Sequence, residues 1–521
     1  MSVSPSFERF EQLAAQYDLV PMYRRLLSDS LTPVSAFKLL DDGRSPACLF
    51  ESVIGGEKVG RYSFIAVHPN GRVAAYGNKV TVAQHGVERE LTGVDPLDTL
   101  WQCVSGKTVA EMPEIPALTG GAFGYAAYDV VRYVEDLPNP PPDDRHLPDL
   151  DFSFFDDLVI FDNVTKTLYL IALVHCEDFP NLRDAWASGE TRLAAMAKQL
   201  QRSVAPLDSS DLPANDSRPN LNAESNFTPE SFAQAIDKCT EYIRAGDIFQ
   251  VVISQRFALD RVCEPLEVYR SLRIVNPSPF MFLLRTPAVT LVGASPEVMC
   301  RVQEGVVTVR PLAGTRPRGK TVAEDTKLAE DLLSDAKERA EHVMLVDLGR
   351  NDVGRVAKFG SIHLSDVMVI ERYSHVMHIS SNVDGQLRDD MTAMDAMKAC
   401  LPAGTVSGAP KVRAMEVIDE VEPHRRGPYA GAVGYIDYHG NMDTCIALRT
   451  LVFTDDKIYI QSGAGIVADS VAATEYQETL NKAKAMLRAV EVTVARQSGA
   501  TDSSAAGRDA TPVSAANSKI S

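Results

Sequence analysis

Short strand-like runs separated by turns most constrain the fold of this chain of 521 residues. Within residues 1–200 they occur at 47–52, 62–67 and 158–161. Residues 289–310 have the pattern of a hairpin, and further strands are predicted at 430–438, 444–453 and 457–461. Strands joined by hairpins, with helices between them, predict an α+β fold and not a repeating βαβ pattern.

Helical periodicity is strongest in residues 227–495. Thr228 can cap a helix with Pro229 at its first position, and Gly246 can end that helix. Further helices are predicted at 326–348, 391–399 and 471–494. Residues 203–226 are rich in Ser, Pro, Asn and Asp and predict a linker or long loop. Residues 497–521 lack the apolar side chains that would offset ordering entropy, so a disordered tail is predicted.

Charge, cysteine spacing and the lack of long apolar runs narrow the partners and the cell compartment expected for this chain. The formal net charge of −18 disfavours nucleic acid and anionic membranes, which are bound mainly through Lys and Arg. The eight cysteines form no C-x-x-C pair, which is typical of a reduced protein. Residues 1–19 contain no apolar signal segment, and no apolar run is long enough to span a membrane. We therefore expect a cytoplasmic protein with no nucleic-acid or membrane partner.

Two predicted helices carry acidic pairs. Glu338 and Glu341 are three residues apart and share a face, as do Glu475 and Glu478, with Lys482 four residues further on. Carboxylates on adjacent helical turns suit a hard cation such as Mg²⁺, which prefers oxygen ligands. Either helix alone is better explained as a solvated face with an i,i+4 ion pair.

Three glycine-containing loops can bring backbone close to an anion. Residues 463–468 read G-A-G-I-V-A and follow a strand, but the helix begins only near Val471, so we reject a dinucleotide site. Residues 404–411 lack the ending of a phosphate-binding P-loop, and 310–319 form a basic stretch in an acidic chain. Each loop alone is more simply a turn. Glu297 or His378 alone would be structural, and no Ser-His-Asp or Cys-His pattern is visible.

Taken together, these segments resemble the chorismate-utilising enzymes. The matching segments are G-D-I-F-Q-V-V-I-S-Q-R (246–256), G-A-S-P-E (293–297), P-L-A-G-T-R-P-R-G (311–319), A-E-H-V-M-L-V-D-L-G-R-N-D (340–352), R-Y-S-H-V-M-H (372–378), G-T-V-S-G-A-P-K (404–411), G-A-G-I-V-A-D-S (463–470) and E-Y-Q-E-T (475–479). The similarity extends over about residues 10–495. It implies an α+β fold of two large, mainly antiparallel sheets packed together, with helices outside and the active site between the sheets.

Three features favour the anthranilate synthase branch of this family. Gln250 stands where the water-activating members carry a lysine base, and a glutamine cannot take a proton at neutral pH. Ala313 stands where aminodeoxychorismate synthases commonly have a nucleophilic lysine. Residues 49–52 and 276–282 resemble the tryptophan-binding elements of anthranilate synthases. The expected activity is that of a lyase that forms anthranilate and pyruvate from chorismate and ammonia, the first step of tryptophan biosynthesis.

The resemblance also implies roles for individual residues. Mg²⁺ would be held by Glu341 and Glu478, supported by Glu338 and Glu475. Glu297 would be the general acid, His378 would assist the elimination, and Gln250 would stand in place of a base. The residues implied in substrate binding are Gly314, Thr315, Thr405, Tyr429, Arg449, Gly463, Ala464, Gly465 and Lys482. Tryptophan would bind as an inhibitor near Ser52, Pro279, Phe280 and Met281.

The implied partner is a separate glutamine amidotransferase small subunit that delivers ammonia, in a heterotetramer. The domain organisation expected from the resemblance is an N-terminal region with the tryptophan elements (1–200) and a chorismate-binding catalytic region (227–495). Two alternatives remain open from the sequence: an aminodeoxychorismate synthase component I, which keeps the pyruvate, and an inactive tryptophan-binding regulatory homologue.

Overall fold

The computed structural model describes residues 3–52, 60–84, 86–202, 207, 219, 221–373 and 376–506, with side chains as far as residue 498. The helices of this part of the chain are α1 (Phe7–Ala14), α2 (Pro33–Leu40), α3 (Pro96–Val104), α4 (Leu182–Leu200), α5 (Pro229–Ala245), α6 (Pro265–Val275), α7 (Val322–Ser334), α8 (Ala336–Gly354), α9 (Ala393–Cys400), α10 (Lys411–Val421) and α11 (Ala472–Ala506), with 3-10 helices η1 (Tyr128–Tyr133), η2 (Cys176–Asp178) and η3 (Gly404–Val406).

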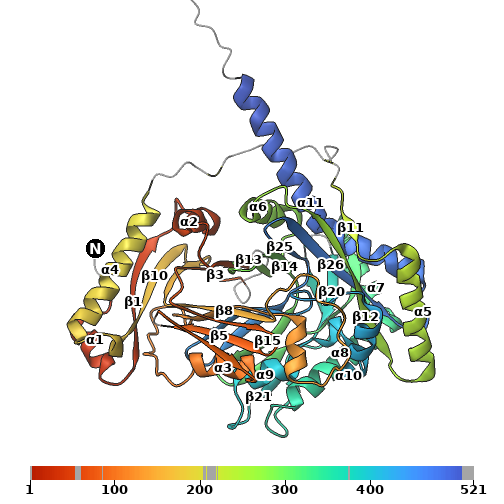
Figure 1. Ribbon diagram of the computed structural model, residues 1–521, viewed down its shortest axis with the longest axis horizontal. Helices are drawn as coiled ribbons and strands as arrows, with labels where there is room; N and C mark the ends of the chain where they lie inside the picture. Colours follow the sequence, from red (N-terminus) through yellow and green to blue (C-terminus); the bar gives the residue numbers. More distant parts are fainter. Residues whose placement is uncertain are drawn as a thin grey trace, which may run out of the picture.

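Two large antiparallel sheets and one small one contain the strands (Figure 1). The first sheet has the order β1 (Leu19–Leu27), β10 (Thr167–His175), β9 (Asp157–Asp162), β3 (Tyr62–Val67), β2 (Ala47–Glu51), β13 (Phe280–Arg285), β14 (Thr290–Ser295), β25 (Thr450–Phe453), β26 (Lys457–Ile466), β12 (Gln250–Asp260), β11 (Glu224–Ser225), and β22 (Gly408–Ala409) also pairs with β12. The predicted α+β class is confirmed.

The second large sheet has the order β18 (His363–Leu364), β21 (Val383–Gln386), β16 (Val306–Val309), β15 (Val298–Gln303), β24 (Met442–Ile446), β23 (Ala432–Asp437), β7 (Gly121–Ala126), β8 (Leu150–Phe155), β4 (Gly71–Tyr76), β5 (Lys79–Gln84), β6 (Val87–Thr92). The small sheet has the order β17 (Leu312–Pro317), β20 (Val376–Ser380), β19 (Val369–Arg372).

The two large sheets pack face to face. Phe50 of the first sheet contacts Phe123 of the second, with ring centroids 5.9 Å apart. Phe282 and Val433, again from opposite sheets, are buried in the same apolar cluster. Helices α4, α6 and α11 contact the first sheet, and α3, α8 and α9 contact the second. The layers therefore bury apolar area on both faces of each sheet, which is the main source of stability in such a fold.

Both halves of the chain contribute to both sheets. Strand β2 pairs with β13 in the first sheet, and β7 pairs with β23 in the second. Residues 1–200 and 227–495 are thus joined by continuous backbone hydrogen bonding. Of the predicted linker, the structure describes residues 207, 219 and 221–226, which include β11.

Local signals account for several boundaries. Thr228 and Ser231 form a capping box at the start of α5, and Gly246 ends the helix with a left-handed φ of 85°, as predicted. The helix expected at 326–348 is two helices, because Asp335 ends α7 and its side chain caps α8. Helix α11 continues to Ala506, beyond the predicted start of the tail at residue 497, and its end projects from the body in Figure 1.

The hairpin expected at 289–310 is divided between two sheets. Strand β14 belongs to the first sheet, whereas β15 and β16 belong to the second. The chain crosses between them at residues 296–297. It crosses back between β24 and β25, at residues 447–449. Each crossing is hydrogen-bonded to a strand that adjoins the other crossing, since Ile446 N of β24 donates to Glu297 O and Ala294 N of β14 donates to Arg449 O. At the first crossing, Glu297 lines a pocket together with residues of α8 and η3.

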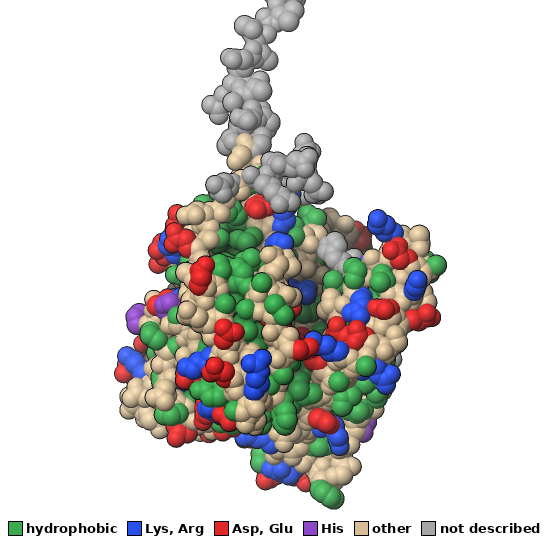
Figure 2. Space-filling model, turned by 90° about the vertical axis from the view of Figure 1, so that its right-hand side faces the viewer, with side chains coloured by type: hydrophobic (Ala, Val, Ile, Leu, Met, Phe, Trp, Pro, Cys, Tyr) green, Lys and Arg blue, Asp and Glu red, His purple; other side chains and the backbone are tan. Residues whose placement is uncertain are grey.

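The surface carries both signs of charge. On the face shown in Figure 2, Lys and Arg side chains are interspersed with Asp and Glu. Within the described residues, no helix has the length and apolar character needed to cross a membrane.

Candidate active site

Glu297 occupies the first crossing between the sheets, and its side chain is 5% exposed. Burial raises the pKa of this carboxyl to about 8, although hydrogen bonds from Thr405 and from the backbone of Leu312 favour the charged form. A carboxyl with such a pKa is largely protonated at neutral pH. Glu297 can therefore donate a proton, which an ordinary glutamate cannot do under these conditions.

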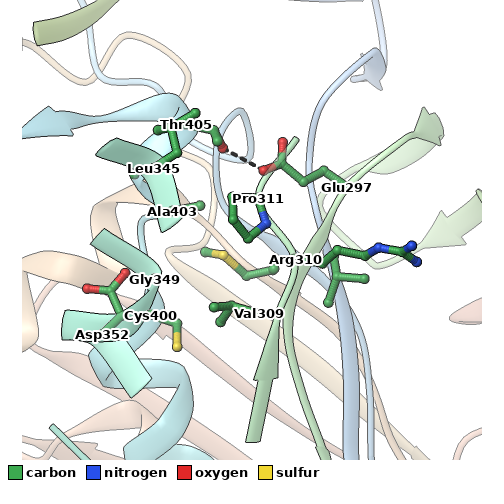
Figure 3. Close-up of a pocket in the computed structure, with 13 residues that line it drawn as sticks. Glu297, Val309, Arg310, Pro311, Leu345, Gly349, Asp352, Cys400, Ala403 and Thr405 are labelled. Atoms are coloured by element: carbon green, nitrogen blue, oxygen red, sulfur yellow. Dashed lines mark hydrogen bonds between the residues drawn. The ribbon is translucent and has the colours of Figure 1, made fainter. Parts of the chain in front are cut away.

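A narrow pocket adjoins this carboxyl (Figure 3). Thr405, from η3, donates a hydrogen bond of 2.9 Å to Glu297 Oε1. The pocket has a volume of about 30 Å³, which is room for a molecule of the size of water. Gly404 packs closely on α8, because a Cβ there would lie 2.5 Å from Leu348 Cδ2 and would displace that side chain. This close approach brings the Thr405 hydroxyl to the glutamate.

His378 lies on β20, opposite a bulge in β17. Its Nδ1 is 2.8 Å from Gly314 O and 3.2 Å from Thr315 Oγ1. Because a carbonyl oxygen only accepts, Nδ1 carries the proton and Nε2 keeps its lone pair. Burial lowers the pKa of His378, and the charges of Arg449 and Lys482 lower it further. The imidazole is therefore neutral at pH 7 and can act as a base.

Arg449 occupies the second crossing, with a left-handed φ of 48°. Burial lowers the pKa of its guanidinium, and no carboxylate among the described residues pairs with it. Its position next to the Glu297 crossing makes it a cation ready for a ligand carboxylate, which a guanidinium binds through two parallel hydrogen bonds.

Tyr429 and the glycine-rich end of β26 form an adjacent surface. A Cβ on Gly463 would lie 2.8 Å from the Tyr429 hydroxyl oxygen, and Lys482 Nζ donates a hydrogen bond of 2.9 Å to Gly463 O. A Cβ on Gly465 would lie 2.6 Å from Gln250 Nε2. Ala464, between these glycines, is fully buried. The predicted substrate residues of β26 thus lie against Tyr429, Gln250 and Lys482.

Gln250 links this surface to helix α8. It is 4% exposed, and its Nε2 donates a hydrogen bond of 3.4 Å to Glu341 Oε1. Its Oε1 is buried without a hydrogen-bond partner among the described residues. An unsatisfied buried acceptor is costly unless a ligand or water donates to it.

The four predicted metal carboxylates come from α8 and α11. The pKa of Glu341 is raised by burial and by the charges of Glu338 and Glu478. The pKa of Glu475 is raised by burial and by Glu478. The carboxylates therefore repel one another within interaction range, although Glu338 also pairs with Arg316 at 3.4 Å and Glu478 with Lys482 at 2.7 Å.

This donor set fits a hard cation. Burial is the largest cause of the raised pKa of Glu341, and a divalent ion would offset both that burial and the repulsion from Glu338 and Glu478. Oxygen atoms are the ligands that Mg²⁺ prefers. In the described part of the chain, no three acidic, His or Cys side chains converge closely enough to form a complete metal cage. Mg²⁺ commonly keeps waters or ligand oxygens in its coordination shell, so an incomplete protein cage is consistent with it.

The predicted tryptophan elements lie side by side. Met281 of β13 pairs with Glu51 of β2, so the register places Phe280 beside Ser52 at the end of the ladder. Glu51 is buried and hydrogen-bonded to Tyr269 and Arg273 of helix α6, which holds this end of β2 against the helix. The chain segment directly after Ser52, residues 53–59, lies outside the described residues.

Several residues near the site were not predicted. Arg426 is 1% exposed, pairs with Glu422 at 2.7 Å, and lies over the Tyr429 ring at 5.6 Å. Tyr373 lies edge-on to His378. Tyr373 is within a matching segment, R-Y-S-H-V-M-H, but nothing in its local sequence distinguishes it from an ordinary core tyrosine.

Comparison with known proteins gives consistent matches. The family of chorismate binding enzymes matches residues 45–488. The chain is 44% identical over 490 residues to anthranilate synthase component 1 of Acetivibrio thermocellus, covering 94% of this chain and 98% of that protein. It is 48% identical over 488 residues to the protein of the same name from Pseudomonas putida, covering 93% and 98%.

Solved structures agree in fold. Anthranilate synthase component I from Streptococcus pneumoniae superposes with a TM-score of 0.72 at 36% identity, covering 89% of this chain and 99% of that chain. The menaquinone-specific isochorismate synthase of Escherichia coli has a TM-score of 0.64 at 18% identity, covering 93% and 98%, and shares the fold.

Proposed function

The chain belongs to the family of chorismate binding enzymes, and from this premise we propose that it is an anthranilate-forming lyase that acts on chorismate and ammonia. The observation that carries the proposal is the placement of a buried acid and a half-buried cation at neighbouring points of the fold. Glu297, with a pKa of about 8, and Arg449 lie at the two crossings between the sheets, and each crossing is hydrogen-bonded to a strand that adjoins the other. Chorismate offers a ring hydroxyl to the first and a carboxylate to the second.

Binding uses the residues around β26. Arg449 holds the enolpyruvyl carboxylate through its fork, while Tyr429 and the backbone from Gly463 to Gly465 complete that end of the site. Gly314, Thr315 and Thr405 line the ring. Lys482, whose Nζ contacts Glu478 and Gly463 O, adds a positive charge at the same end of β26 for binding the substrate.

Mg²⁺ is part of the proposal. Glu341 and Glu478 would hold it, with Glu338 and Glu475 in support. When bound, the ion supplies Lewis-acid polarisation at the ring carboxylate. The residues of this chain fit that role through their oxygen donors and their mutual repulsion.

Ammonia attacks the ring carbon next to the one that bears the carboxylate, and the ring hydroxyl leaves as water. Glu297 gives its proton to that hydroxyl, because hydroxide is a poor leaving group. Gln250 cannot deprotonate water, which favours attack by ammonia, whose lone pair needs no base. The small pocket beside Glu297 has the size for such a nucleophile. The product of this step is aminodeoxyisochorismate.

The second step removes pyruvate and makes the ring aromatic. A ring proton must leave, and the enolpyruvyl group departs with it. His378 supports this step because its neutral Nε2 has no hydrogen-bond partner among the described residues and can accept a proton. Aromatisation makes the step strongly favourable.

Ammonia is scarce at neutral pH because most of it is ammonium. We therefore include in the proposal a separate glutamine amidotransferase subunit that supplies it, in a heterotetramer with this chain. The relatives carry the name component 1, which supports a second component. The proposal also includes feedback inhibition by tryptophan at the end of β2 and β13, around Ser52, Pro279, Phe280 and Met281. The residues of this proposed tryptophan site differ from those proposed to bind chorismate, although Phe280 pairs with Ser295, two residues before Glu297, so the proposed inhibition is allosteric.

The purified chain, chorismate, Mg²⁺ and ammonium salt at alkaline pH provide the test. We expect anthranilate fluorescence and one pyruvate for each chorismate consumed. A 4-amino product that keeps the enolpyruvyl group would instead identify an aminodeoxychorismate synthase. Binding of tryptophan without any turnover would identify a regulatory homologue.

A further inference from the structure

A buried tyrosine that has no role in the chemistry proposed above lies against its base. Tyr373 is 8% exposed and follows β19. Its hydroxyl donates a hydrogen bond of 2.6 Å to Glu371 Oε2, and its backbone N donates to Val376 O at 2.8 Å. Burial and the charge of Glu371 raise the pKa of Tyr373. The hydroxyl therefore remains protonated and serves as a fixed donor.

The carboxylate that receives this bond is itself held from two sides. Ser380 Oγ donates to Glu371 Oε1 at 3.0 Å, and Arg310 forms an ion pair with the same carboxylate. Arg310 Nε also donates to Ser380 Oγ at 3.1 Å. Arg310 lines the pocket that contains Glu297 (Figure 3). The Tyr373 hydroxyl is thus anchored to a network that adjoins the active site.

The Tyr373 ring and the His378 imidazole pack edge to face. The ring centroids are 5.5 Å apart and the planes are inclined by 60°. Gly314 O fixes which nitrogen of His378 carries the proton, at 2.8 Å from Nδ1. Among the described residues, the polar contacts of the imidazole are made by Nδ1, to Gly314 O and to Thr315 Oγ1 at 3.2 Å, so the Nε2 side of the ring retains freedom to tilt. Contact with a rigid ring removes that freedom, as catalytic geometry requires.

We propose that Tyr373 is a positioning residue for the elimination step: anchored through its hydroxyl to Glu371, its ring keeps the His378 imidazole turned so that Nε2 faces the ring proton of the intermediate. This inference rests on the proposed function, and it assigns Tyr373 to the second step and not to the first. Ammonia addition depends on Glu297 and does not require His378. Loss of Tyr373 therefore slows pyruvate release more than chorismate consumption.

Three variants test this: Tyr373→Phe, Tyr373→Leu and His378→Asn. Chromatography after a single turnover measures the ratio of anthranilate to aminodeoxyisochorismate, and chorismate consumption measures the first step. We expect Tyr373→Leu to lower the rate of anthranilate formation about 10-fold to 100-fold. Free aminodeoxyisochorismate should accumulate, and the KM for chorismate should remain nearly unchanged. Tyr373→Phe keeps the ring and loses only its anchor, so the same shift is expected at a smaller size.

A double-mutant cycle separates positioning from a general loss of structure. In the His378→Asn background, Tyr373→Leu should cause no further loss of the elimination rate, because the group that it positions is already absent. Tyr125→Leu is the matched control: Tyr125 is fully buried in β7, and its hydroxyl donates to Pro148 O. That variant should be less stable without releasing the intermediate.

Equal losses from Tyr373→Leu in both backgrounds would overturn the proposal. An unchanged product ratio in both Tyr373→Phe and a folded Tyr373→Leu would do the same. If the parent chain formed neither aminodeoxyisochorismate nor anthranilate, the proposed function itself would fall, and the role of Tyr373 with it.

Discussion

The Thr405 hydroxyl donates its hydrogen to Oε1 of a glutamate 108 positions earlier in the chain, Glu297, at 2.9 Å. This bond favours the charged carboxylate, whereas burial favours the neutral acid. Burial dominates, because the pKa is raised to about 8. The balance between these two effects sets the pH range in which the proposed acid can work.

Replacement of the acid itself should abolish most of the chemistry. Glu297→Gln keeps the shape and the acceptor for Thr405 but cannot give up a proton. General acid catalysis typically contributes 10²-fold to 10⁴-fold, so kcat should fall by about that factor. The KM for chorismate should change little. Steady-state fluorescence of anthranilate measures both, and a loss of less than about threefold in kcat would contradict the assignment.

Removal of the Thr405 hydroxyl should move the alkaline limb of the pH profile. The proton on Glu297 is required, so activity declines as pH rises through about 8. Thr405→Val removes a bond that lowers the pKa, so the pKa rises and the decline shifts to higher pH. Thr405→Ser keeps the hydroxyl and should leave the profile in place. The assay must hold free ammonia constant at each pH, and a shift toward lower pH in Thr405→Val would refute the prediction.

The carboxylates of α8 and α11 should control the requirement for Mg²⁺. Glu341→Gln or Glu478→Gln replaces one carboxylate of the proposed site by a neutral amide. At least about tenfold more Mg²⁺ should therefore be needed for the half-maximal rate. Chelation should stop the parent reaction, and added Mg²⁺ should restore it.

Glu491→Gln is the control for these variants. Glu491 lies on the same helix α11 but pairs with Arg488 at 3.0 Å. Its replacement should leave the Mg²⁺ titration unchanged. Equal Mg²⁺ curves for all three variants and the parent would exclude this metal site.

The buried pair behind Tyr429 should matter for stability. Glu422 and Arg426 have side chains 2% and 1% exposed, so Glu422→Gln leaves a buried guanidinium without its counter-ion. Loss of one partner of a buried pair costs about 3–5 kcal/mol of unfolding free energy. Glu420→Gln, two residues earlier, breaks a largely exposed pair with Lys238 and should cost less than about 1 kcal/mol. Urea unfolding measures both variants, and similar midpoints would contradict the prediction.

A bulky side chain at the end of β2 should relieve tryptophan inhibition. Ser52→Phe fills the space beside Phe280 in the register, so tryptophan should no longer inhibit while kcat for chorismate stays close to the parent value. Val87→Phe adds the same ring to the exposed strand β6 and should remain sensitive. Inhibition curves at fixed chorismate provide the measurement, and full sensitivity in Ser52→Phe would remove this proposed site.

Local chemistry in the sequence predicted much of the helical structure, and long-range pairing limited the rest. The cap at Thr228 and the stop at Gly246 depend on adjacent residues, so they can be read directly. Strand pairing has no such local signal, because the alternation of side chains defines a face and not a partner. This is why residues 289–310 were expected to form one hairpin although β14 and β15 belong to different sheets.

The same limit applies to the site. Glu341 and Glu478 could be singled out because each has a second carboxylate one turn away, a pattern within a single helix. The Gln250–Glu341 bond and the contact of Tyr373 with His378 depend on how separate elements pack. The boundary between α7 and α8 at Asp335 has a local signal, since an Asp before a helical run is a common N-cap. The prediction of a single helix over residues 326–348 did not use this signal.

The pairing of β2 with β13 and of β7 with β23 governs how this protein can be cut. Division of the chain near residue 210 would not separate two self-sufficient pieces. Each fragment would expose two unpaired edge strands to solvent, and unpaired edge strands promote aggregation. Two fragments produced together could restore the β2–β13 and β7–β23 pairings and so complete both sheets. Co-expression is therefore the way to obtain a folded split form of this enzyme.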